Sequence, residues 1–411
     1  MMLILTLNCG SSSLKCQLYD EDTDKIVAKA TAERIGLDGA VISVKSDSGE
    51  VTLKDKTVAD HKEAIENILQ CFKETGVLKN IEEIEAAGHR IVHGGDLFQK
   101  STLIDEDVIK RIESISHLAP LHNPSNVLGI RVLENILPKI PHVAVFDTAF
   151  HSTIPEKAHR YAIPGEWYDK YKVRRYGFHG SSHLYVSKRT AKILGKPAMQ
   201  CNMIILHVGN GASITAVENG LSVDTSMGMT PLEGVIMGTR SGNIDASIPA
   251  FITKMTGQSI EEVNEALYKQ SGLLGLTGKY SDRRDIEANA ETDELCKLAI
   301  EMECYNLKKY IGSYMAVLNR VDAIAFTGGV GENSAIIREK TLENLEYLGV
   351  ELDKEKNNSL KRGSEAEIST SSSKIKVFVI PTDEEIVLTE DVIAVLKGEY
   401  QDHSSHPYSF L

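Results

Sequence analysis

The chain has 411 residues, of which 42% are hydrophobic and 25% charged, the balance of a globular protein with roughly two or three domains. Lys and Arg number 45 and Asp and Glu 58, so the formal net charge of −13 argues against a surface that coats nucleic acid or an anionic membrane. No run approaches the roughly 20 apolar residues that cross a bilayer, and the N-terminal segment lacks the basic leader of a signal peptide. The six cysteines include no Cys-x-x-Cys pair and are too sparse for a disulfide scaffold, which predicts reduced thiols and a cytoplasmic location.

Strands and helices are predicted to alternate along the first part of the chain. Residues 3–7 and 14–19 are apolar runs separated by a short polar loop, which is typical of two paired strands. Residues 58–75 repeat apolar side chains at helical spacing. The elements expected after them are a strand over 86–92, helices over 105–115 and 124–137, and a strand over 142–146.

The opening pattern returns near the middle of the chain. Residues 203–208 are predicted to form an apolar strand, 209–213 a small polar loop, and 214–217 a second strand that ends in a hairpin turn. The segments ILTLNCGSSSLKCQL and IILHVGNGASITAV therefore share one plan, and they predict two related domains that each open with a hairpin. A chance likeness between two hairpins is the alternative.

The last part of the chain is expected to continue the alternation. A strand over 321–326 leads into a glycine loop over 327–331, and a helix follows from 333 onward. A further strand over 374–380 is ended by a proline, and a helix is expected over 384–396.

Three of these loops have the composition of a phosphate-binding loop. A phosphate requires closely spaced backbone N–H groups, small side chains and a cation, and the segment from Asn8 to Lys15 offers Gly10, three serines and a lysine. The segments 209–211 and 327–333 offer glycines at strand ends, where a ligand can approach the backbone. A serine-rich hairpin, a simple turn and a tight packing turn are the structural alternatives. Neither the P-loop pattern nor the dinucleotide-binding glycine pattern is present.

Charged side chains are concentrated in other predicted loops. Arg90 has a guanidinium that can bind a carboxylate or phosphate through two hydrogen bonds, and Asp147 follows a buried strand. His179 and His183 are four apart, but the glycine between them argues against a helix there and against a metal site. Arg240 lies in a loop bracketed by glycines. Surface arginines and a capping carboxylate are the alternatives, but phosphoryl transfer requires positioning and charge neutralisation, and this set fits that need.

The chain resembles the acetokinase family, a branch of the superfamily that contains actin, sugar kinases and heat-shock chaperone ATPases. Nine motifs occur in the order of that family and cover nearly the whole chain, so the resemblance is specific. The motifs are LNCGSSSLK, GHRIVHGG, APLHNP, VFDTAFH, RRYGFHGSSH, HVGNGAS, DTSMGMTPLEGVIMGTRSGNID, FTGGVGENS and IPTDEEI.

The resemblance implies an α/β fold of two duplicated, actin-like domains, each a mixed sheet flanked by helices, with the active site in the cleft between them. Residues 1–149 would form the N-terminal domain, with 386–411 packing back on it, and 150–385 the nucleotide-binding domain. The implied reaction is reversible phosphoryl transfer from ATP to acetate, giving ADP and acetyl phosphate by direct in-line transfer. Mg²⁺, with Mn²⁺ as an alternative, is the implied metal, and a homodimer is the implied assembly.

The matching motifs also imply roles for individual residues. Asn8 and Glu384 would serve the metal, and Asp147, His179 and Arg240 would be catalytic. The acetate side would comprise Arg90, Val92, Leu121, Phe178 and Pro231. The ATP side would comprise Lys15, His207, Val208, Gly209, Asn210, Gly211, Asp282, Arg283, Arg284, Gly329, Val330, Gly331, Glu332 and Asn333.

Two residues of these motifs require comment. Acetate is already ionised at neutral pH and needs no general base, so we expect Asp147 to orient or stabilise charge in preference to transferring a proton. Asp383 stands where the family often has Asn, which adds negative charge near the metal. We expect this difference to have little effect on function.

Three rival functions are weighed against this one. A kinase for propionate or butyrate is the nearest, because one methylene in a pocket is worth only about 1–3 kcal/mol, although Val92 favours a small pocket. A non-catalytic ATP switch would keep the nucleotide loops and lose the acyl-side residues, yet Arg90, Asp147, His179 and Arg240 are all present. A structural phosphate-binding module is the third.

Overall fold

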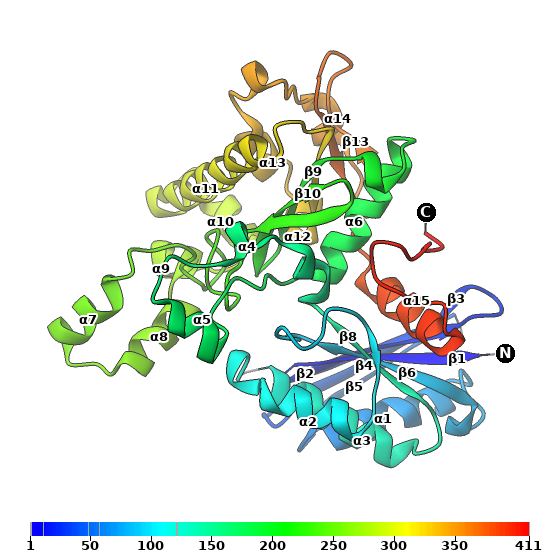
Figure 1. The fold of residues 1–411 in the computed structure, drawn as a ribbon. Coiled ribbons are helices and arrows are strands. Elements are labelled where there is room, and N and C mark those ends of the chain that lie inside the picture. The colour runs from blue at the N-terminus through cyan, green and yellow to red at the C-terminus, as the bar shows by residue number, and fades with distance from the viewer. Residues whose placement is uncertain (1, 11, 48, 57, 121, 411) are drawn as a thin grey trace. The chain divides into compact units, whose positions relative to one another are not determined.

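The computed structural model describes residues 2–10, 12–47, 49–56, 58–120 and 122–410, and the chain divides into two compact units (Figure 1). The first unit contains the chain up to Phe150 together with Asp383–Ser409, and the second contains His151–Thr382 and Phe410. The chain thus leaves the first unit after Phe150 and returns to it at Asp383. None of the described helices combines the length and the apolar run that a bilayer crossing requires.

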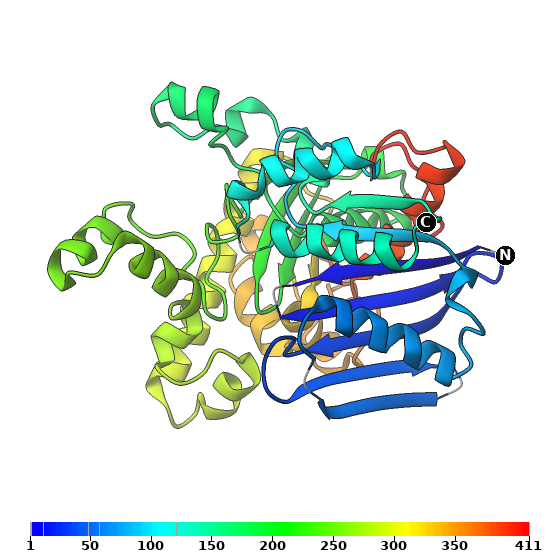
Figure 2. The same cartoon turned by 90° about the horizontal axis from the view of Figure 1, so that it is seen from below.

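A mixed sheet forms the centre of the first unit (Figure 2). Its described strands are β1 (Leu3–Cys9), β2 (Ser13–Asp20), β3 (Lys25–Glu33), β4 (Ala40–Ser46), β5 (Gly49–Lys56), β6 (Ile84–Ile91), β7 (Thr102–Leu103) and β8 (His142–Phe146). They lie in the order β5-β4-β3-β2-β1-β6-β8-β7. β1 pairs antiparallel with β2 and parallel with β6, and β6 pairs parallel with β8. The strands at the centre therefore place their carboxyl ends at one edge of the sheet.

Helices cover both faces of this sheet because its central strand is apolar on both sides. The helices are α1 (His61–Glu74), α2 (Glu106–Ser114), α3 (Asn123–Ile136) and α15 (Glu384–Lys397). On β1, Leu3, Leu5 and Leu7 belong to the core shared with α1 and α3, whereas Ile4 belongs to the core that Val392 of α15 completes. This alternation follows from the two-residue period of a strand. The segment that returns from the second unit thus becomes one of the two covering layers (Figure 1).

Asp383 is the N-cap of α15. Its side chain accepts a hydrogen bond from the backbone N–H of Ile386 at 3.0 Å, and the helix ends at Gly398, which has φ +71°. A carboxylate in this position satisfies a free N–H group and interacts favourably with the helix dipole. The charge that distinguishes this chain from an Asn at the same position is therefore engaged by the helix terminus.

The second unit is built around a sheet of the same plan. Its described strands are β9 (Met203–Val208), β10 (Ala212–Glu218), β11 (Leu221–Thr225), β12 (Ala323–Thr327), β13 (Ala366–Glu367) and β14 (Lys376–Val379). They lie in the order β11-β10-β9-β12-β14-β13. β9 pairs antiparallel with β10 and parallel with β12, and β12 pairs parallel with β14. β9, β10, β11, β12 and β14 thus repeat the arrangement of β1, β2, β3, β6 and β8, which confirms the predicted duplication.

The helices of the second unit differ widely in length and burial. They are α4 (Glu156–His159), α5 (Gly165–Tyr171), α6 (Gly180–Ile193), α7 (Ile248–Thr256), α8 (Ile260–Lys269), α9 (Gly272–Thr277), α10 (Arg283–Asn289), α11 (Glu294–Leu318), α12 (Gly328–Asn333), α13 (Ala335–Leu342) and α14 (Lys354–Ser359). α6 packs against β9 and β12, and α11 packs against β9 and β10. α7 and α8 pack on each other and project from the rest of their unit (Figure 2).

Two local predictions were wrong, and both concern glycines. Residues 327–331 were expected to form a loop, but α12 begins at Gly328, whose φ of +77° turns the chain sharply out of β12. The buried Arg338 then donates to the carbonyls of Gly331 and Glu332 at 3.0 Å, so a tertiary contact compensates for the low helix propensity of glycine. Similarly, α6 begins at Gly180, so His183 is helical.

Several histidines are buried in these cores and are held in the neutral form. His89 and His142 share a hydrogen bond of 2.9 Å between Nε2 and Nδ1, and burial lowers the pKa of both. In the second unit His151 is fully buried; its Nε2 lies 3.0 Å from the carbonyl oxygen of Phe178, and its Nδ1 lies 2.9 Å from the hydroxyl of Ser222. Burial lowers the pKa of His151 from 6.5 to about 4. Folding therefore requires these rings to remain unprotonated.

We expect acid to destabilise the fold through His151. Because the pKa of this ring is about 4 in the folded chain and 6.5 in the unfolded chain, the unfolded chain binds the extra proton between these values. Stability is then lost as the pH falls below 6.5, by about 2 kcal/mol for this group between pH 7 and pH 5. Urea denaturation at both pH values should show that His151→Gln loses about 2 kcal/mol less than the wild type over this interval. An equal loss in the two proteins would contradict the prediction.

Candidate active site

Arg90 and Asp147 form an ion pair at the carboxyl end of two neighbouring strands in the first unit. Arg90 belongs to β6 and Asp147 directly follows β8. Nε and Nη2 of Arg90 donate to Oδ1 and Oδ2 of Asp147, each at 2.7 Å, and Nη2 lies 3.8 Å from Oε2 of Glu384. Among the described residues, Nη1 of Arg90 has no hydrogen-bond partner. Two of the predicted active-site residues and one predicted metal residue are thus brought together.

This pair is charged although it is largely buried. Burial raises the pKa of Asp147 above its usual range, and the Arg90 guanidinium opposes that shift. For Arg90, burial favours the neutral form, but Asp147 and Glu384 outweigh it and raise its pKa. Because a guanidinium does not deprotonate, its two hydrogen bonds keep Asp147 ionised. With both oxygens engaged, Asp147 is suited to hold Arg90 in one orientation.

Two asparagines of α3 fix the backbone around this pair. Asn126 accepts from the N–H of Val92 at 3.0 Å and donates to the carbonyl of Cys9 at 2.7 Å, so it joins the ends of β6 and β1. Asn123 accepts from the N–H of His93 at 3.1 Å and donates to its carbonyl at 2.9 Å. No sequence pattern predicts these contacts, although Asn123 lies in the motif APLHNP. Val92 itself is half-buried, and Leu121 lies outside the described residues.

The predicted metal residues offer oxygen ligands. Asn8 lies near the end of β1, opposite Lys15 of β2 in the strand register, and Glu384 is the first residue of α15, which packs on β1. Amide and carboxylate oxygens are the protein ligands that Mg²⁺ accepts. Within the described residues, no group of three or more His, Cys, Asp and Glu side chains could hold a metal alone. The donors present therefore fit an ion that takes most of its ligands from water and phosphate.

In the second unit, His179 and Arg240 lie beside the loop that joins β9 to β10. A Cβ added to Gly211 would lie 3.4 Å from Nη1 of Arg240 and 3.6 Å from Nε2 of His179. The His179 ring stacks on His207, with ring centroids 4.2 Å apart. Nη1 of Arg240 donates to the carbonyl of Pro231 at 3.1 Å. These predicted residues are thus brought together around one glycine.

In the described part of the chain, Arg240 lacks the acidic partner that three other arginines of the two units have. Arg338 is also buried without a carboxylate there, but it donates to the side chain of Asn357 and to three backbone carbonyls. Arg90, Arg175 and Arg283 each form an ion pair, with Asp147, Glu233 and Glu303 respectively. Among the described residues, no carboxylate lies within ion-pairing distance of Arg240, and burial lowers its pKa. A partly buried guanidinium without a counter-ion is suited to bind an anion from outside the chain.

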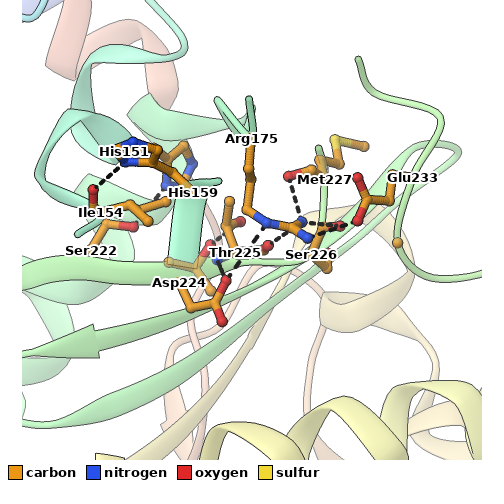
Figure 3. Close-up of polar contacts among 12 residues, drawn as sticks. His151, Ile154, His159, Arg175, Ser222, Asp224, Thr225, Ser226, Met227 and Glu233 are labelled. Carbon is orange, nitrogen blue, oxygen red and sulfur yellow. Dashed lines mark hydrogen bonds and ion pairs between the residues drawn. The ribbon is translucent and has the colours of Figure 1, made fainter. Parts of the chain in front are cut away.

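Arg175 anchors the segment that carries Arg240 (Figure 3). Its Nη1 donates to the carbonyls of Thr225, Ser226 and Met227, at 2.8, 3.1 and 3.2 Å, where the chain leaves β11. Its Nη2 donates to Oε1 of Glu233 at 2.7 Å. One side chain therefore satisfies three carbonyls and ties them to a carboxylate further along the same loop. No motif in the sequence predicts this contact, because it depends on the pairing of distant segments.

A cavity of about 840 Å³ opens beside the same glycine loop, within the size range of small-molecule sites. Several residues predicted for the ATP side line it, namely Gly209, Asn210, Asp282, Arg283, Arg284, Gly329, Val330 and Asn333. It is also lined by residues that were not predicted, namely Ser281, Glu287, Ser334 and Arg362. The other predicted residues of the ATP side are not among the residues that line it, namely Lys15, His207, Val208, Gly211, Gly331 and Glu332.

The two arginines at the start of α10 have different environments. Arg283 is 5% exposed, donates from Nε to Glu303 at 2.7 Å, and donates from Nη1 to the carbonyl of Gly209 at 2.8 Å. It therefore fixes the backbone of the loop 209–211 to Glu303 of α11. The side chain of Arg284 is 90% exposed and pairs with Asp282. Of these two arginines, Arg284 is the one whose guanidinium is accessible to a ligand.

Glu332 stabilises the turn at the start of α12. Its carboxylate accepts from the N–H of Gly328 at 2.9 Å and from the N–H of Thr382 at 3.2 Å. The ends of β12 and β14 are thereby held together, so the glycines that follow β12 have a fixed backbone. Asn333 donates to the carbonyl of Gly329 at 2.8 Å within the same turn.

Comparisons with known proteins identify the family. The model of the acetokinase family matches residues 3–390. The acetate kinase of Geobacter metallireducens is 54% identical over 413 aligned positions, which cover 100% of this chain and 98% of that protein. The crystal structure of Porphyromonas gingivalis acetate kinase is 43% identical with a TM-score of 0.91, over 96% of this chain and 100% of that one. A propionate kinase from Francisella tularensis is also 43% identical, with a TM-score of 0.90, over 96% and 99%. The chain therefore belongs to the acetokinase family.

Proposed function

We propose that this protein is an acetate kinase that transfers a phosphoryl group reversibly between ATP and acetate. The observation that carries the proposal is the position of Arg240, a cation without an acidic partner among the described residues, beside His179 and Gly211. A phosphoryl group in transfer concentrates negative charge on its oxygens, and preorganised donors of this kind stabilise it. The names of the relatives at about half identity support acetate as the acceptor.

On the acetate side, Arg90 is proposed to bind the carboxylate. Asp147 engages Nε and Nη2, so Nη1 is the nitrogen left to donate to the substrate. Acetate is ionised at neutral pH, and Asp147 uses both its oxygens on Arg90, so no proton transfer is assigned to it. We propose that Val92, Phe178 and Pro231 contact the methyl group.

On the ATP side, the cavity beside the loop 209–211 is proposed to hold the nucleotide. Lys15, His179 and Arg240 would balance the charge of the phosphates, and the transfer would be direct because the ionised oxygen of acetate is itself the nucleophile that attacks the phosphorus. Asn8 and Glu384 would help to hold Mg²⁺, which when bound neutralises phosphate charge. Direct transfer requires that both sets of residues act on one pair of reactants.

The proposed setting is a homodimer in the cytoplasm. All six cysteines are buried, as thiols of a reducing compartment often are. Large apolar side chains are exposed on the second unit, among them Phe251 at 60%, Met255 at 65% and Tyr305 at 66%. Exposed apolar groups of this size support contact with another copy of the chain. Light scattering on the purified protein should give a mass of twice 45.2 kDa.

The proposed reaction is tested by steady-state kinetics with ATP, Mg²⁺ and acetate, propionate or butyrate, trapping the acyl phosphate as its hydroxamate. We expect the highest kcat/KM with acetate. A clear preference for propionate would favour the second candidate, which is supported by the likeness to the Francisella propionate kinase. Absence of acyl phosphate with all three acids would refute the proposal.

Arg240→Ala should lower kcat at least about a hundredfold, because one donor to the transferring group is lost. Arg320→Ala is the matched control, since this arginine is exposed and pairs with Asp322 away from the proposed site. It should retain nearly normal kinetics. Wild-type turnover in Arg240→Ala would remove Arg240 from the catalytic set.

Gly211→Ala should lower kcat at least about tenfold while changing the free energy of unfolding by less than about 1 kcal/mol. The added methyl would make only ordinary contacts, but it would occupy the space between Nη1 of Arg240 and Nε2 of His179. Gly312→Ala in α11 is the control, because a Cβ there meets nothing within 4 Å. Kinetics and urea denaturation of both variants decide the matter; unaltered kcat in Gly211→Ala would mean that the space is not used in the reaction.

A further inference from the structure

The hydroxyl of Ser213 lies between two histidine rings. Ser213 is fully buried on β10, and its Oγ is 2.9 Å from Nδ1 of His179 and 2.7 Å from Nε2 of His183. His179 immediately precedes α6 and has φ +59°, and His183 lies in the first turn of that helix. One hydroxyl therefore connects a residue of the proposed catalytic set to a histidine in the core.

The protonation state of His183 can be derived from its surroundings. The ring is fully buried, and burial together with the nearby His151 and His207 lowers its pKa well below 6.5. It therefore carries one proton. Its Nδ1 is buried and, within the described residues, has no hydrogen-bond partner. A buried N–H without an acceptor is less favourable than a buried lone pair, so the proton lies on Nε2, which donates to Ser213.

The hydroxyl proton of Ser213 then has one acceptor among the described residues. The Ser213 hydroxyl accepts from His183 and has a single hydrogen to donate. Its other close partner among the described residues is Nδ1 of His179. That nitrogen must be an acceptor, and a neutral ring with an unprotonated Nδ1 carries its proton on Nε2.

We propose that His183 and Ser213 are positioning residues that hold His179 in the tautomer with its proton on Nε2. The inference rests on the proposed function, in which His179 donates to the transferring phosphoryl group. Nε2 is the nitrogen near the Cβ position of Gly211, on the side where Nη1 of Arg240 also lies. The opposite tautomer would direct a lone pair toward the phosphoryl oxygens and repel them. The chain of hydrogen bonds thus makes His179 a donor before the substrate arrives, without cost at the moment of transfer.

The wild-type protein tests the assignment directly. In protein labelled with ¹⁵N-histidine, the ring signals of His179 are identified by their loss in His179→Gln. At a pH where the ring is neutral, we expect Nδ1 to have the shift of an unprotonated nitrogen and Nε2 that of a protonated one. The reverse pattern, or an even mixture of tautomers, would overturn the proposal. This readout does not depend on turnover, so it is distinct from a failure of the proposed reaction, which the kinetics with acetate would reveal.

Variants test whether the two residues act through His179. Ser213→Ala should give a mixture of His179 tautomers and lower kcat about tenfold or more, with KM for ATP and acetate changed less than about twofold. His183→Phe, which removes the donor but keeps a ring, should act in the same direction. Thr215→Val is the matched control, because Thr215 is buried two residues away on the same strand and its hydroxyl bonds to Thr225 at 2.9 Å. It should keep the wild-type tautomer and kcat, even where stability falls. A wild-type tautomer together with wild-type kcat in Ser213→Ala would overturn the proposal.

Discussion

The parallel pairing of the central strands is the constraint on which the arrangement of side chains depends. In each unit the first strand pairs parallel with a second, which pairs parallel with a third, so three carboxyl ends meet at one edge. In the first unit Asn8, Arg90 and Asp147 lie at these ends; in the second, His207 and the glycines after β12 do. Ligand sites of α/β sheets lie at this edge because the loops there can approach one another. Arg90 and Asp147, which are 57 positions apart in the sequence, become neighbours for that reason.

The largely buried arginines differ in their acceptors. Most donate to carboxylates or backbone carbonyls of the chain, whereas Arg240 retains donors for an external anion. Arg175 and Arg283 each combine a carboxylate with backbone carbonyl contact, so Arg175 fixes the segment after β11 and Arg283 the loop that contains Gly211. Arg90 donates from Nε and Nη2 to Asp147, and its Nη1 remains as a donor for a ligand. Arg240 has a carbonyl but no carboxylate among the described residues. Arg338 is also buried without a carboxylate among these residues, but it donates to four oxygens of the chain, whereas Arg240 donates to one carbonyl and so retains donors for an anion.

The regular elements and the motif residues could be predicted from the sequence, whereas the contacts that orient them could not. The strands at 142–146 and 203–208 were predicted with their observed bounds, because a short apolar run between turn residues is a local signal. The glycine-rich segment 327–331 was predicted to be a loop, because no local sequence pattern indicates that Arg338 stabilises a helical turn there. Ser213 ends the motif HVGNGAS, but its role depends on its hydrogen bonds to His179 and His183, which no local pattern predicts. Asp383 was noted as a difference without a reason, and the cap that it forms became evident only with the helix terminus.

The closed pairing of Arg90 with Asp147 has a consequence for how a small carboxylate is selected. Asp147 already balances the charge of the Arg90 guanidinium, and Oε2 of Glu384 lies 3.8 Å from its Nη2. The guanidinium therefore exerts little long-range attraction on an approaching anion. Recognition at this point then depends on contact, through the direction of one N–H group and the shape of the surroundings. Such a site selects small anions by their shape and not by their charge. One small anion can therefore leave and another enter without the large energetic cost of separating strongly attracted ions.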